Sequence, residues 1–288
     1  EVDMVRTSVG VCDVSTLGKI DIQGPDAHRL LDFVYTNIFS TLKVGKVRYG
    51  LMLREDGHVM DDGTTARLAE NHYVMTTTTA AAGQVMRHLD FVHQCLHPEW
   101  DVSFISVTEQ WAQFSIAGPK SQELVNAVLD KPISSETFPF MSCASVGVLG
   151  EAGRLFRISF SGEHGYEIAV PSRYGESLFR LLVSRAEEIG GGPYGMEALN
   201  VLRLEKGFIT HAEIHGRITA FDLGMQRMVS EKKDCIGKTS ASRPGLLDSD
   251  REQLIALKPV GSVKQITAGA HLFDLDDEPI RQNDKGYV

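Results

Sequence analysis

Residues 45–67, GKVRYGLMLREDGHVMDDGTTAR, decide how this chain folds. Residues 49–53 form an apolar run with strand character, and residues 54–57 end in the Asp-Gly pair that is typical of hairpin turns. His58 then begins a return strand. The stretch therefore predicts a β-hairpin.

The return strand ends in two adjacent carboxylates, Asp61 and Asp62. Neighbouring residues on a strand point to opposite faces, so one of the two side chains must face the apolar interior. A buried carboxylate costs free energy unless a donor meets it. A structural pair, satisfied by a backbone N–H or an arginine, is the simpler interpretation from spacing, and a functional site is the alternative.

Composition excludes several classes of function. The chain has 288 residues and a net charge of −9, from 29 basic and 38 acidic side chains, which argues against non-specific nucleic-acid binding. Its four cysteines are far apart and its histidines are scattered, so we expect no metal site and reduced thiols. We find no signal peptide and no apolar run long enough for a bilayer, and we expect a cytoplasmic location without membrane contact.

A strand, a Gly-Pro pair and an amphipathic helix occur twice, at residues 18–35 and 111–129. Proline fits the first helical turn, where its missing N–H is not needed. Two similar α+β units are therefore predicted, with coincidence as the alternative because Gly-Pro is a common turn. We expect one region over 1–235, built from interleaved units of about 1–50 with 140–230 and about 51–139. The short apolar runs of 251–288 suggest the start of a small β-barrel.

Two further segments could contribute to a site. Glu163 lies in the predicted turn at 161–165, and Glu167 lies within an apolar strand, where a glutamate usually faces water. In the predicted helix at 195–207, the three-residue spacing of Glu197, Asn200 and Arg203 places them on one face. A solvated face is the simpler interpretation. Alternatively, these residues converge with Tyr49 and the aspartate pair on a cleft that receives N–H groups.

Together these motifs resemble the aminomethyltransferase (glycine-cleavage T-protein) family. The resemblance rests on residues 11–15 (VCDVS), 24–27 (GPDA), the YGLML…DG…MDD hairpin, 117–119 (AGP), FSGEHGYEI and EALNVLRLEKG, in the family's order along nearly the whole chain. Within the family, YGLMLREDGHVMDDGTTARL, TTTTA and SVTEQWAQFSIAGPKS look most like the C-terminal folate module of the alpha subunit of heterotetrameric sarcosine oxidase. The chain starts without methionine and stops where a strand should continue, so we expect a segment of a longer polypeptide.

The resemblance implies an α+β fold of two similar subdomains plus a C-terminal β-barrel subdomain, with tetrahydrofolate bound at their centre. Asp62 matches the family's key acid, Tyr49 the tyrosine beside the folate, and Glu167 the glutamate that binds the pterin N–H groups. Thr77 and Phe160 fall where T-proteins often have Asn and an aromatic residue. Glu197 and Asn200 are further candidates for cofactor binding. T-proteins commonly have Arg-Asp at positions 199–200, where this chain has Leu-Asn, and this departure fits the sarcosine oxidase branch better.

The implied activity is one-carbon transfer. The module would capture the iminium or formaldehyde from oxidation of an N-methyl amine such as sarcosine as 5,10-methylenetetrahydrofolate. The flavins and NAD of such an oxidase, and the oxidation itself, are expected on other segments or on other sarcosine oxidase subunits, which are the expected partners. A stand-alone aminomethyltransferase of glycine cleavage and a non-catalytic folate-binding module are the alternatives.

Overall fold

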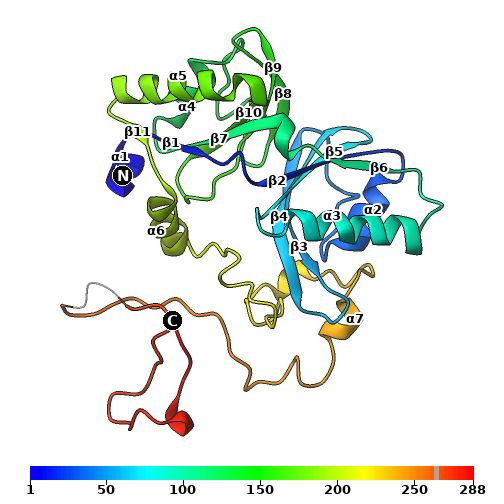
Figure 1. Cartoon of the computed structure of the whole chain (residues 1–288), viewed down its shortest axis with the longest axis vertical. Helices are drawn as coiled ribbons and strands as arrows, with labels where there is room; N and C mark the ends of the chain where they lie inside the picture. The colour runs from blue at the N-terminus through cyan, green and yellow to red at the C-terminus, as the bar shows by residue number, and fades with distance from the viewer. Residues whose placement is uncertain (263–265) are drawn as a thin grey trace.

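The computed structural model of the chain describes residues 1–262 and 266–288 and contains two β-sheets (Figure 1). The first sheet has five strands in the order β3-β4-β5-β2-β6. Its strands in chain order are β2 (Gly18–Gln23), β3 (Lys46–Leu53), β4 (Val59–Ala69), β5 (His72–Thr77) and β6 (Ser103–Ser106). All of its paired neighbours are antiparallel.

The second sheet has six strands in the order β11-β1-β7-β10-β9-β8. Its strands in chain order are β1 (Gly10–Asp13), β7 (Trp111–Ala117), β8 (Cys143–Val148), β9 (Glu151–Phe156), β10 (Gly165–Pro171) and β11 (Gly192–Pro193). Only the pair β1 and β11 is parallel among the strands described. The two sheets meet where the N–H of Cys143 donates to the carbonyl of Gly45, at 2.9 Å.

Each sheet has helices against one face, and a separate apolar core lies beneath them. The helices are α1 (Val2–Thr7), α2 (Ala27–Val34), α3 (Ala82–Phe91), α4 (Ser121–Asn126), α5 (Gly175–Glu188), α6 (Met196–Lys206) and α7 (Lys238–Ala241). The apolar side chains of α2 and α3 pack on the first sheet. Those of α4 and α5 pack on the second. Short turns of 3-10 or π helix complete the elements, at η1 (Val92–Leu96), η2 (Thr108–Gln110), η3 (Ser172–Tyr174), η4 (Gln226–Met228) and η5 (Arg281–Asn283).

The predicted hairpin is formed by β3 and β4. The N–H of Gly57 donates to the carbonyl of Arg54 at 2.9 Å, and Gly57 has a φ of +90°, which favours glycine. A bulge interrupts the register between Met52 and Leu53. The return strand does not end at the two aspartates as expected: β4 runs on to Ala69, so Asp61 and Asp62 lie near its beginning.

The predicted repeat is confirmed. The order β3-β4-β5-β2 of the first sheet matches the order β8-β9-β10-β7 of the second. Gly24 and Gly118 end the equivalent strands β2 and β7 with φ values of +136° and +128°. A Cβ at Gly24 would lie 2.3 Å from the carbonyl oxygen of Asp101, and one at Gly118 would lie 2.4 Å from that of Val5. Both glycines are thus required by backbone conformation and by a close backbone contact.

The sheets divide the chain differently from the expected boundaries. A boundary near residue 50 would cut β3, which pairs with β4 along its whole length. A boundary near 139 would separate β7 from β10, although the two pair over seven residues. The strands of residues 18–106 form one sheet, and those of residues 10–13 and 111–193 form the other. The units are interleaved because β1, which precedes the first sheet in the chain, belongs to the second sheet. There it pairs with β7 in the same way that β6 pairs with β2 in the first sheet.

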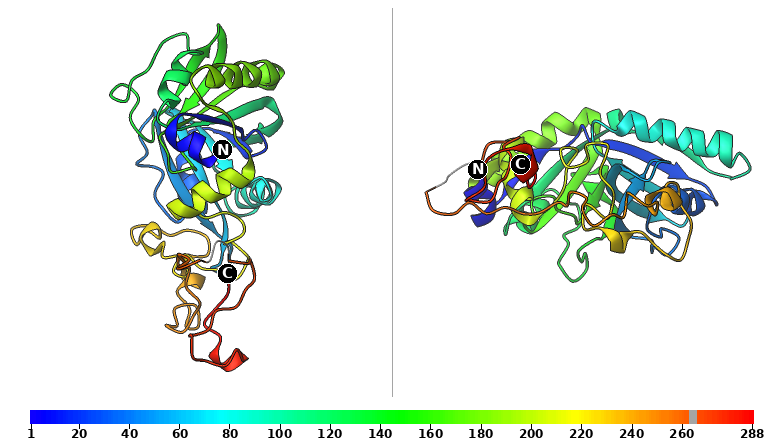
Figure 2. Two further views of the ribbon diagram at one scale, coloured as in Figure 1. Left: turned by 90° about the vertical axis from the view of Figure 1, so that its left-hand side faces the viewer. Right: turned by 90° about the horizontal axis from the view of Figure 1, so that it is seen from below.

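Residues 251–288 do not contain the expected strands of a barrel in the ranges that the structure describes. The regular features of this segment are a short pairing of residues 269–272 with 285–288, which includes the bridge between His271 and Tyr287, and the 3-10 turn η5. This orange and red segment lies apart from the sheets in Figure 1 and in the left-hand view of Figure 2. Its apolar side chains are exposed, including Val260 at 80% and Leu275 at 99%. A strand needs a neighbouring backbone to pair with, and the segment has little such pairing.

Among the residues described, no helix is both long and apolar enough to span a bilayer.

Candidate functional site

Asp61 and Asp62 point to opposite sides of β4, as alternation along a strand requires. Asp61 is buried and accepts two hydrogen bonds from Thr78, one from the hydroxyl at 2.8 Å and one from the backbone N–H at 3.2 Å. Burial raises the pKa of Asp61 to about 7, although the bonds from Thr78 act in the opposite direction. Asp61 is therefore satisfied by its own chain, as the structural interpretation of an inward carboxylate predicts.

Asp62 has a different environment. It lies opposite Leu51 on β3, and its Oδ2 accepts a hydrogen bond of 2.7 Å from the phenol of Tyr49. Its Oδ1 is buried and has no hydrogen-bond partner among the described residues. Burial raises the pKa of Asp62, the bond from Tyr49 lowers it, and the nearby charge of Glu213 raises it further. An unpartnered carboxylate oxygen that is poised to take up a proton is the feature expected of a functional acid or base.

Tyr49 is fixed as the donor in this pair. Burial and the adjacent charge of Asp62 raise the pKa of Tyr49 well above its usual value, so the phenol keeps its proton. Tyr49 and Asp62 are diagonal neighbours, because Tyr49 lies directly opposite Thr64 and Asp62 lies opposite Leu51. The structure thus brings together the two residues that the sequence paired.

The chain that follows α6 contributes acidic and basic groups to the side of β4 that carries Asp62. Glu213 is held by Arg203 at 2.7 Å and by the backbone N–H of Thr210 at 2.7 Å. Ile209 and Ile214 pack in one apolar cluster with Leu51, the residue opposite Asp62. Sequence reasoning missed Glu213, for which spacing offers no signal, since it comes from a turn-rich segment.

Glu167 is buried within β10, only 6% exposed, so the expectation that it faces water is wrong. The side-chain amide of Gln113 on β7 donates a short hydrogen bond to its Oε2. Burial raises the pKa of Glu167 to about 7, while the bond from Gln113 and the charge of Lys19 act in the opposite direction. Glu167 is thus a buried acid with one oxygen bound by the protein.

Lys19 was not predicted from the sequence. It is buried on β2, and its Nζ donates to the carbonyls of Ser15 at 2.8 Å and Leu17 at 3.0 Å. Burial lowers the pKa of Lys19 to about 8, although the charge of Glu167 favours the protonated form. The position of Lys19 between apolar residues of a strand was the one sequence feature that pointed to it, but a lysine in such a position normally faces solvent.

Thr77 and Phe160 lie in different parts of the structure. Thr77 is buried at the end of β5, and its hydroxyl donates to the carbonyl of Thr78 at 2.9 Å, next to the bonds that hold Asp61. Phe160 lies beyond β9, which ends at Phe156. Its ring stacks on that of Phe208, with 5.9 Å between centroids, and packs near Cys12, Tyr194 and Leu199.

The predicted face of α6 is only partly brought together. Asn200 accepts a hydrogen bond of 3.3 Å from Nε of Arg203, but the guanidinium of Arg203 also binds Glu213 and the carbonyl of Phe208. Glu197 and Asn200 are exposed on this helix. The structure therefore connects Asn200 to the Glu213 group through Arg203 and leaves Glu197 on the outer surface.

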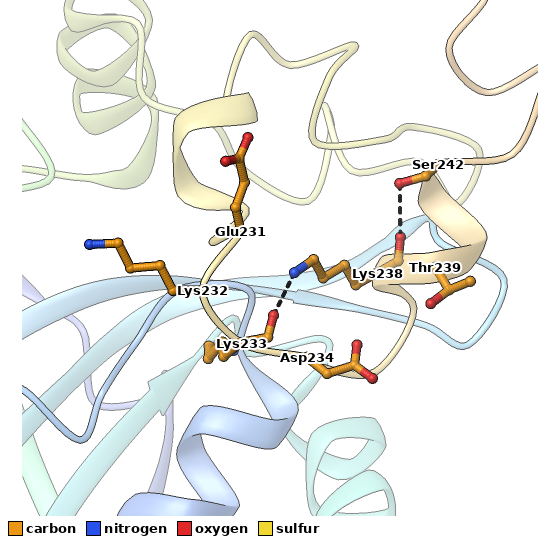
Figure 3. Close-up of a pocket in the computed structure, with 7 residues that line it drawn as sticks. All are labelled: Glu231, Lys232, Lys233, Asp234, Lys238, Thr239 and Ser242. Carbon is orange, nitrogen blue, oxygen red and sulfur yellow. Dashed lines mark hydrogen bonds between the residues drawn. The ribbon is translucent and has the colours of Figure 1, made fainter.

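A shallow cavity lies elsewhere, around the segment before α7 (Figure 3). Its lining residues are Glu231, Lys232, Lys233, Asp234, Lys238, Thr239 and Ser242. Two of its ammonium groups are used internally, because Lys233 donates to the carbonyls of Asp32 and Tyr35 and Lys238 donates to that of Lys233. None of the predicted site residues lines this cavity.

Comparisons with known proteins agree with the fold and with the resemblance. The family model of the GCVT N-terminal domain matches residues 1–233. Sarcosine oxidase subunit alpha from Rhizobium meliloti (strain 1021) is 50% identical over 291 residues, covering 100% of this chain and 30% of that protein. Aminomethyltransferase from Listeria monocytogenes serotype 4a (strain HCC23) is 30% identical over 241 residues, covering 83% of this chain and 64% of that protein.

A solved structure shares the fold. Glycine cleavage system aminomethyltransferase T from Bartonella henselae superimposes with a TM-score of 0.73 at 22% identity, covering 83% of this chain and 63% of that one. The chain spans about 30% of the length of the Rhizobium relative, so the match concerns one part of that longer protein. Since the family model matches residues 1–233 of 288, the predicted resemblance is confirmed, and the chain belongs to the GCVT N-terminal domain family of aminomethyltransferase-like proteins.

Proposed function

We propose that this chain is a tetrahydrofolate-binding one-carbon-transfer module of the kind found in sarcosine oxidase alpha subunits. It would capture the iminium or formaldehyde released on oxidation of an N-methyl amine such as sarcosine, with 5,10-methylenetetrahydrofolate as the product. The observation that carries the proposal is Asp62, whose Oδ2 is fixed by Tyr49 and whose buried Oδ1 lacks a donor among the residues described. Family membership and the sarcosine oxidase relative support it.

The residues fit a ligand rich in N–H groups. Oδ1 of Asp62 is a buried acceptor without a donor among the described residues, and the hydrogen bond from Gln113 to Glu167 uses only Oε2 of that carboxylate. Buried acceptors are normally satisfied, so a partner from outside the chain is the natural complement to such groups. Tyr49, Thr77, Phe160 and Glu167 are the residues that we propose hold tetrahydrofolate, together with Asn200 and Glu197 at the exposed side of α6.

Bound tetrahydrofolate would supply a nucleophilic nitrogen that accepts the one-carbon unit. The contribution of the protein is to manage the proton of that nitrogen. Asp62 can accept it at Oδ1, because burial raises the pKa of its carboxylate above the usual value. Tyr49 keeps its own proton and holds the carboxylate in place, so that the reacting geometry is set before the ligand arrives. Confinement also raises the effective concentration of the one-carbon unit.

Oxidation of the amine would take place elsewhere. We propose that flavin and NAD belong to other segments or subunits of a sarcosine oxidase, and that those subunits are the partners of the full-length protein. The isolated chain is accordingly expected to consume no oxygen when sarcosine is added.

The test is a titration of the isolated chain with tetrahydrofolate, with and without formaldehyde. Binding together with faster formation of 5,10-methylenetetrahydrofolate than in buffer supports the proposal. Binding without acceleration indicates a folate-binding module that does not catalyse. Release of ammonia from an aminomethyl-lipoyl protein would instead identify a stand-alone aminomethyltransferase, and the absence of any folate binding would refute the proposal.

A further inference from the structure

Glu167 is held by a polar residue of the neighbouring strand β7. On β10 it pairs with Ser115 of β7 and with Phe156 of β9. Gln113 precedes Ser115 by two residues on β7, so the two share one face of the strand, and the Gln113 amide donates to Oε2 of Glu167. This bond fixes the orientation of the carboxylate and occupies only one of its oxygens.

Lys19 of the first sheet is linked to Gln113 through Ser15, whose carbonyl accepts from Lys19 Nζ at 2.8 Å and whose hydroxyl accepts from the N–H of Gln113 at 2.9 Å. Its Nζ is bound by the carbonyls of Ser15 and Leu17, in the connection between β1 and β2, so its position is set by backbone atoms. The charges of Lys19 and Glu167 favour each other's ionised forms. Among the described residues, Lys19 is the cation whose charge acts on Glu167.

Cys12 and Tyr194, on which the charge of Glu167 also acts, keep their protons, while Asp13 and Glu109 add negative charge near Lys19. Burial raises the pKa of Cys12 on β1 to about 11 and raises that of Tyr194 above its usual value. Tyr194 shares a hydrogen bond of 3.3 Å with the hydroxyl of Ser115. Arg154 of the neighbouring strand β9 is paired with Asp21 at 3.0 Å instead. Burial has the largest effect on the pKa of Glu167 and raises it, while the bond from Gln113 and the charge of Lys19 oppose that effect.

The internal repeat supplies a second, independent observation. Lys19 lies five residues before Gly24, and Gln113 lies five residues before Gly118, so the two occupy equivalent positions on β2 and β7. Each is buried, at about 2% exposed, and each acts on the same glutamate. The repeat therefore places a cation and an amide donor around a single acid between the two sheets.

We propose that Gln113 and Lys19 are positioning residues that orient the Glu167 carboxylate and favour its ionised form, so that its remaining oxygen can accept N–H groups of a bound ligand. The identity of that ligand rests on the function proposed above, whereas the control of Glu167 by these two residues does not. Neither residue is expected to touch the reacting atoms.

The first measurement follows Glu167 itself in the full chain labelled with ¹³C at its glutamate carboxyls. The resonance is assigned by its loss in Glu167→Gln and titrated between about pH 5 and 9. In the wild type its midpoint is expected near 7, the pKa that burial produces. Gln113→Leu and Lys19→Gln each remove a group that favours the anion, so each is expected to move the midpoint to higher pH. Lys19→Arg keeps the charge and should restore the wild-type midpoint.

The second measurement is tetrahydrofolate binding by the same variants across the same pH range. Gln113→Leu is expected to weaken binding roughly tenfold at pH 7, the loss typical of a hydrogen bond to a charged group. Gln110→Leu, an exposed glutamine just before β7, is the matched control and should bind as the wild type does. A purely structural role would weaken binding equally at every pH without moving the midpoint.

The two failures are distinguishable. Unchanged Glu167 midpoints in both Gln113→Leu and Lys19→Gln, with folding verified by circular dichroism, would overturn the inference whether or not folate binds. A wild type that shows the expected midpoints but binds no tetrahydrofolate would refute the proposed function and leave the control of Glu167 by Gln113 and Lys19 established.

Discussion

The phenol of Tyr49 donates a 2.7 Å hydrogen bond to Oδ2 of Asp62, while Oδ1 of the same carboxylate is buried without a donor among the residues described. The adjacent Asp61, on the opposite face of β4, is fully engaged by Thr78. Two neighbouring aspartates thus lie in different environments: Asp61 is satisfied by Thr78, whereas Asp62 keeps one acceptor without a donor among the described residues.

Asp62→Asn is expected to fold normally and to slow folate-dependent capture of formaldehyde roughly 100-fold or more, because an amide cannot accept the proton that the carboxylate takes. The rate is measured as formation of 5,10-methylenetetrahydrofolate. Asp61→Asn makes the same chemical change on the neighbouring residue and is expected to leave this rate within a few-fold. A wild-type rate in Asp62→Asn would show that Asp62 is not the catalytic group.

Tyr49→Phe is expected to move the acid limb of the pH–rate profile to higher pH. The phenol stabilises the ionised form of Asp62, so its loss raises the pKa of that carboxylate further. A bond to a charged group of about 1.5 kcal/mol corresponds to about one pH unit. Tyr73→Phe is the matched control, since the buried hydroxyl of Tyr73 has no partner among the described residues. An unshifted profile in Tyr49→Phe would contradict the assigned hydrogen bond.

The free energy of unfolding is expected to fall as the pH rises from about 5 to 7. Burial raises the pKa of Asp61 from 3.8 and of Glu167 from 4.5, in each case to about 7. Between these pH values each carboxyl group keeps its proton in the folded protein but has lost it in the unfolded chain. Each group therefore lowers the free energy of unfolding by up to about 1.4 kcal/mol per pH unit. Below about pH 4 both states are protonated, and above pH 7 both are ionised.

Urea unfolding at pH 5, 6, 7 and 8 measures this decline. Glu167→Gln removes one of the two titrations and should flatten the slope between pH 5 and 7, as should Asp61→Asn. If both variants keep the slope of the wild type, the two acids do not titrate as burial predicts.

Gly118→Ala is expected to lower the free energy of unfolding by roughly 2 kcal/mol or more. The position has a φ of +128°, and a Cβ there would lie 2.4 Å from the carbonyl oxygen of Val5. The matched control is Gly83→Ala in α3, where the nearest neighbour of a Cβ is 3.6 Å away and the helix should gain roughly 0.5–1 kcal/mol. Thermal unfolding of both variants provides the comparison, and equal stabilities would show that the close contact at Gly118 is absent.

Arg154→Met is expected to cost roughly 3 kcal/mol, because it leaves the carboxylate of Asp21 buried with only His72 and Gln23 as side-chain partners. The Arg154–Asp21 pair joins β9 of one sheet to β2 of the other, and both side chains are at most 12% exposed. Arg180→Met breaks the exposed pair with Glu176 on α5 and should cost no more than about 0.5 kcal/mol. Denaturant midpoints distinguish the two cases, and a small loss in Arg154→Met would mean that the pair contributes little.

The parts of the fold that depend on local pattern could be predicted from the sequence. The hairpin follows from an apolar run and an Asp-Gly turn, and the repeat follows from Gly-Pro after a strand. The parts that depend on distant contacts could not. β1 could pair with either of two similar sheets, and no local sequence pattern distinguishes the two sheets. The apolar runs after residue 250 suggest strands, yet a strand forms only where another backbone is available to pair with it.

The residues of the candidate site also divide into those that the sequence predicts and those that it does not. Tyr49 and Asp62 could be paired because both belong to one hairpin. Lys19 and Gln113 were missed because polar residues that alternate with apolar ones normally face water. In this protein the strand face that carries Lys19 and Gln113 is covered by the opposite sheet. Alternation of polar and apolar residues therefore predicts the strands correctly, but it wrongly predicts that these two side chains face water. Phe160 and Phe208 come from separate segments, and their stacking has no signal in spacing.

The placement of β1 between β7 and β11 has a consequence for how the chain reaches its native state. During synthesis, residues 18–106 hold every strand of the first sheet and can complete it while the chain is still growing. Residues 10–13 emerge earlier but find both of their neighbours only after residue 193 has been made. β1 can therefore pair with β7 once residue 117 has been made, but its second neighbour, β11, is available only later. The connection between β1 and β2, whose carbonyls hold Lys19, is accordingly tied at both ends only when the second sheet closes.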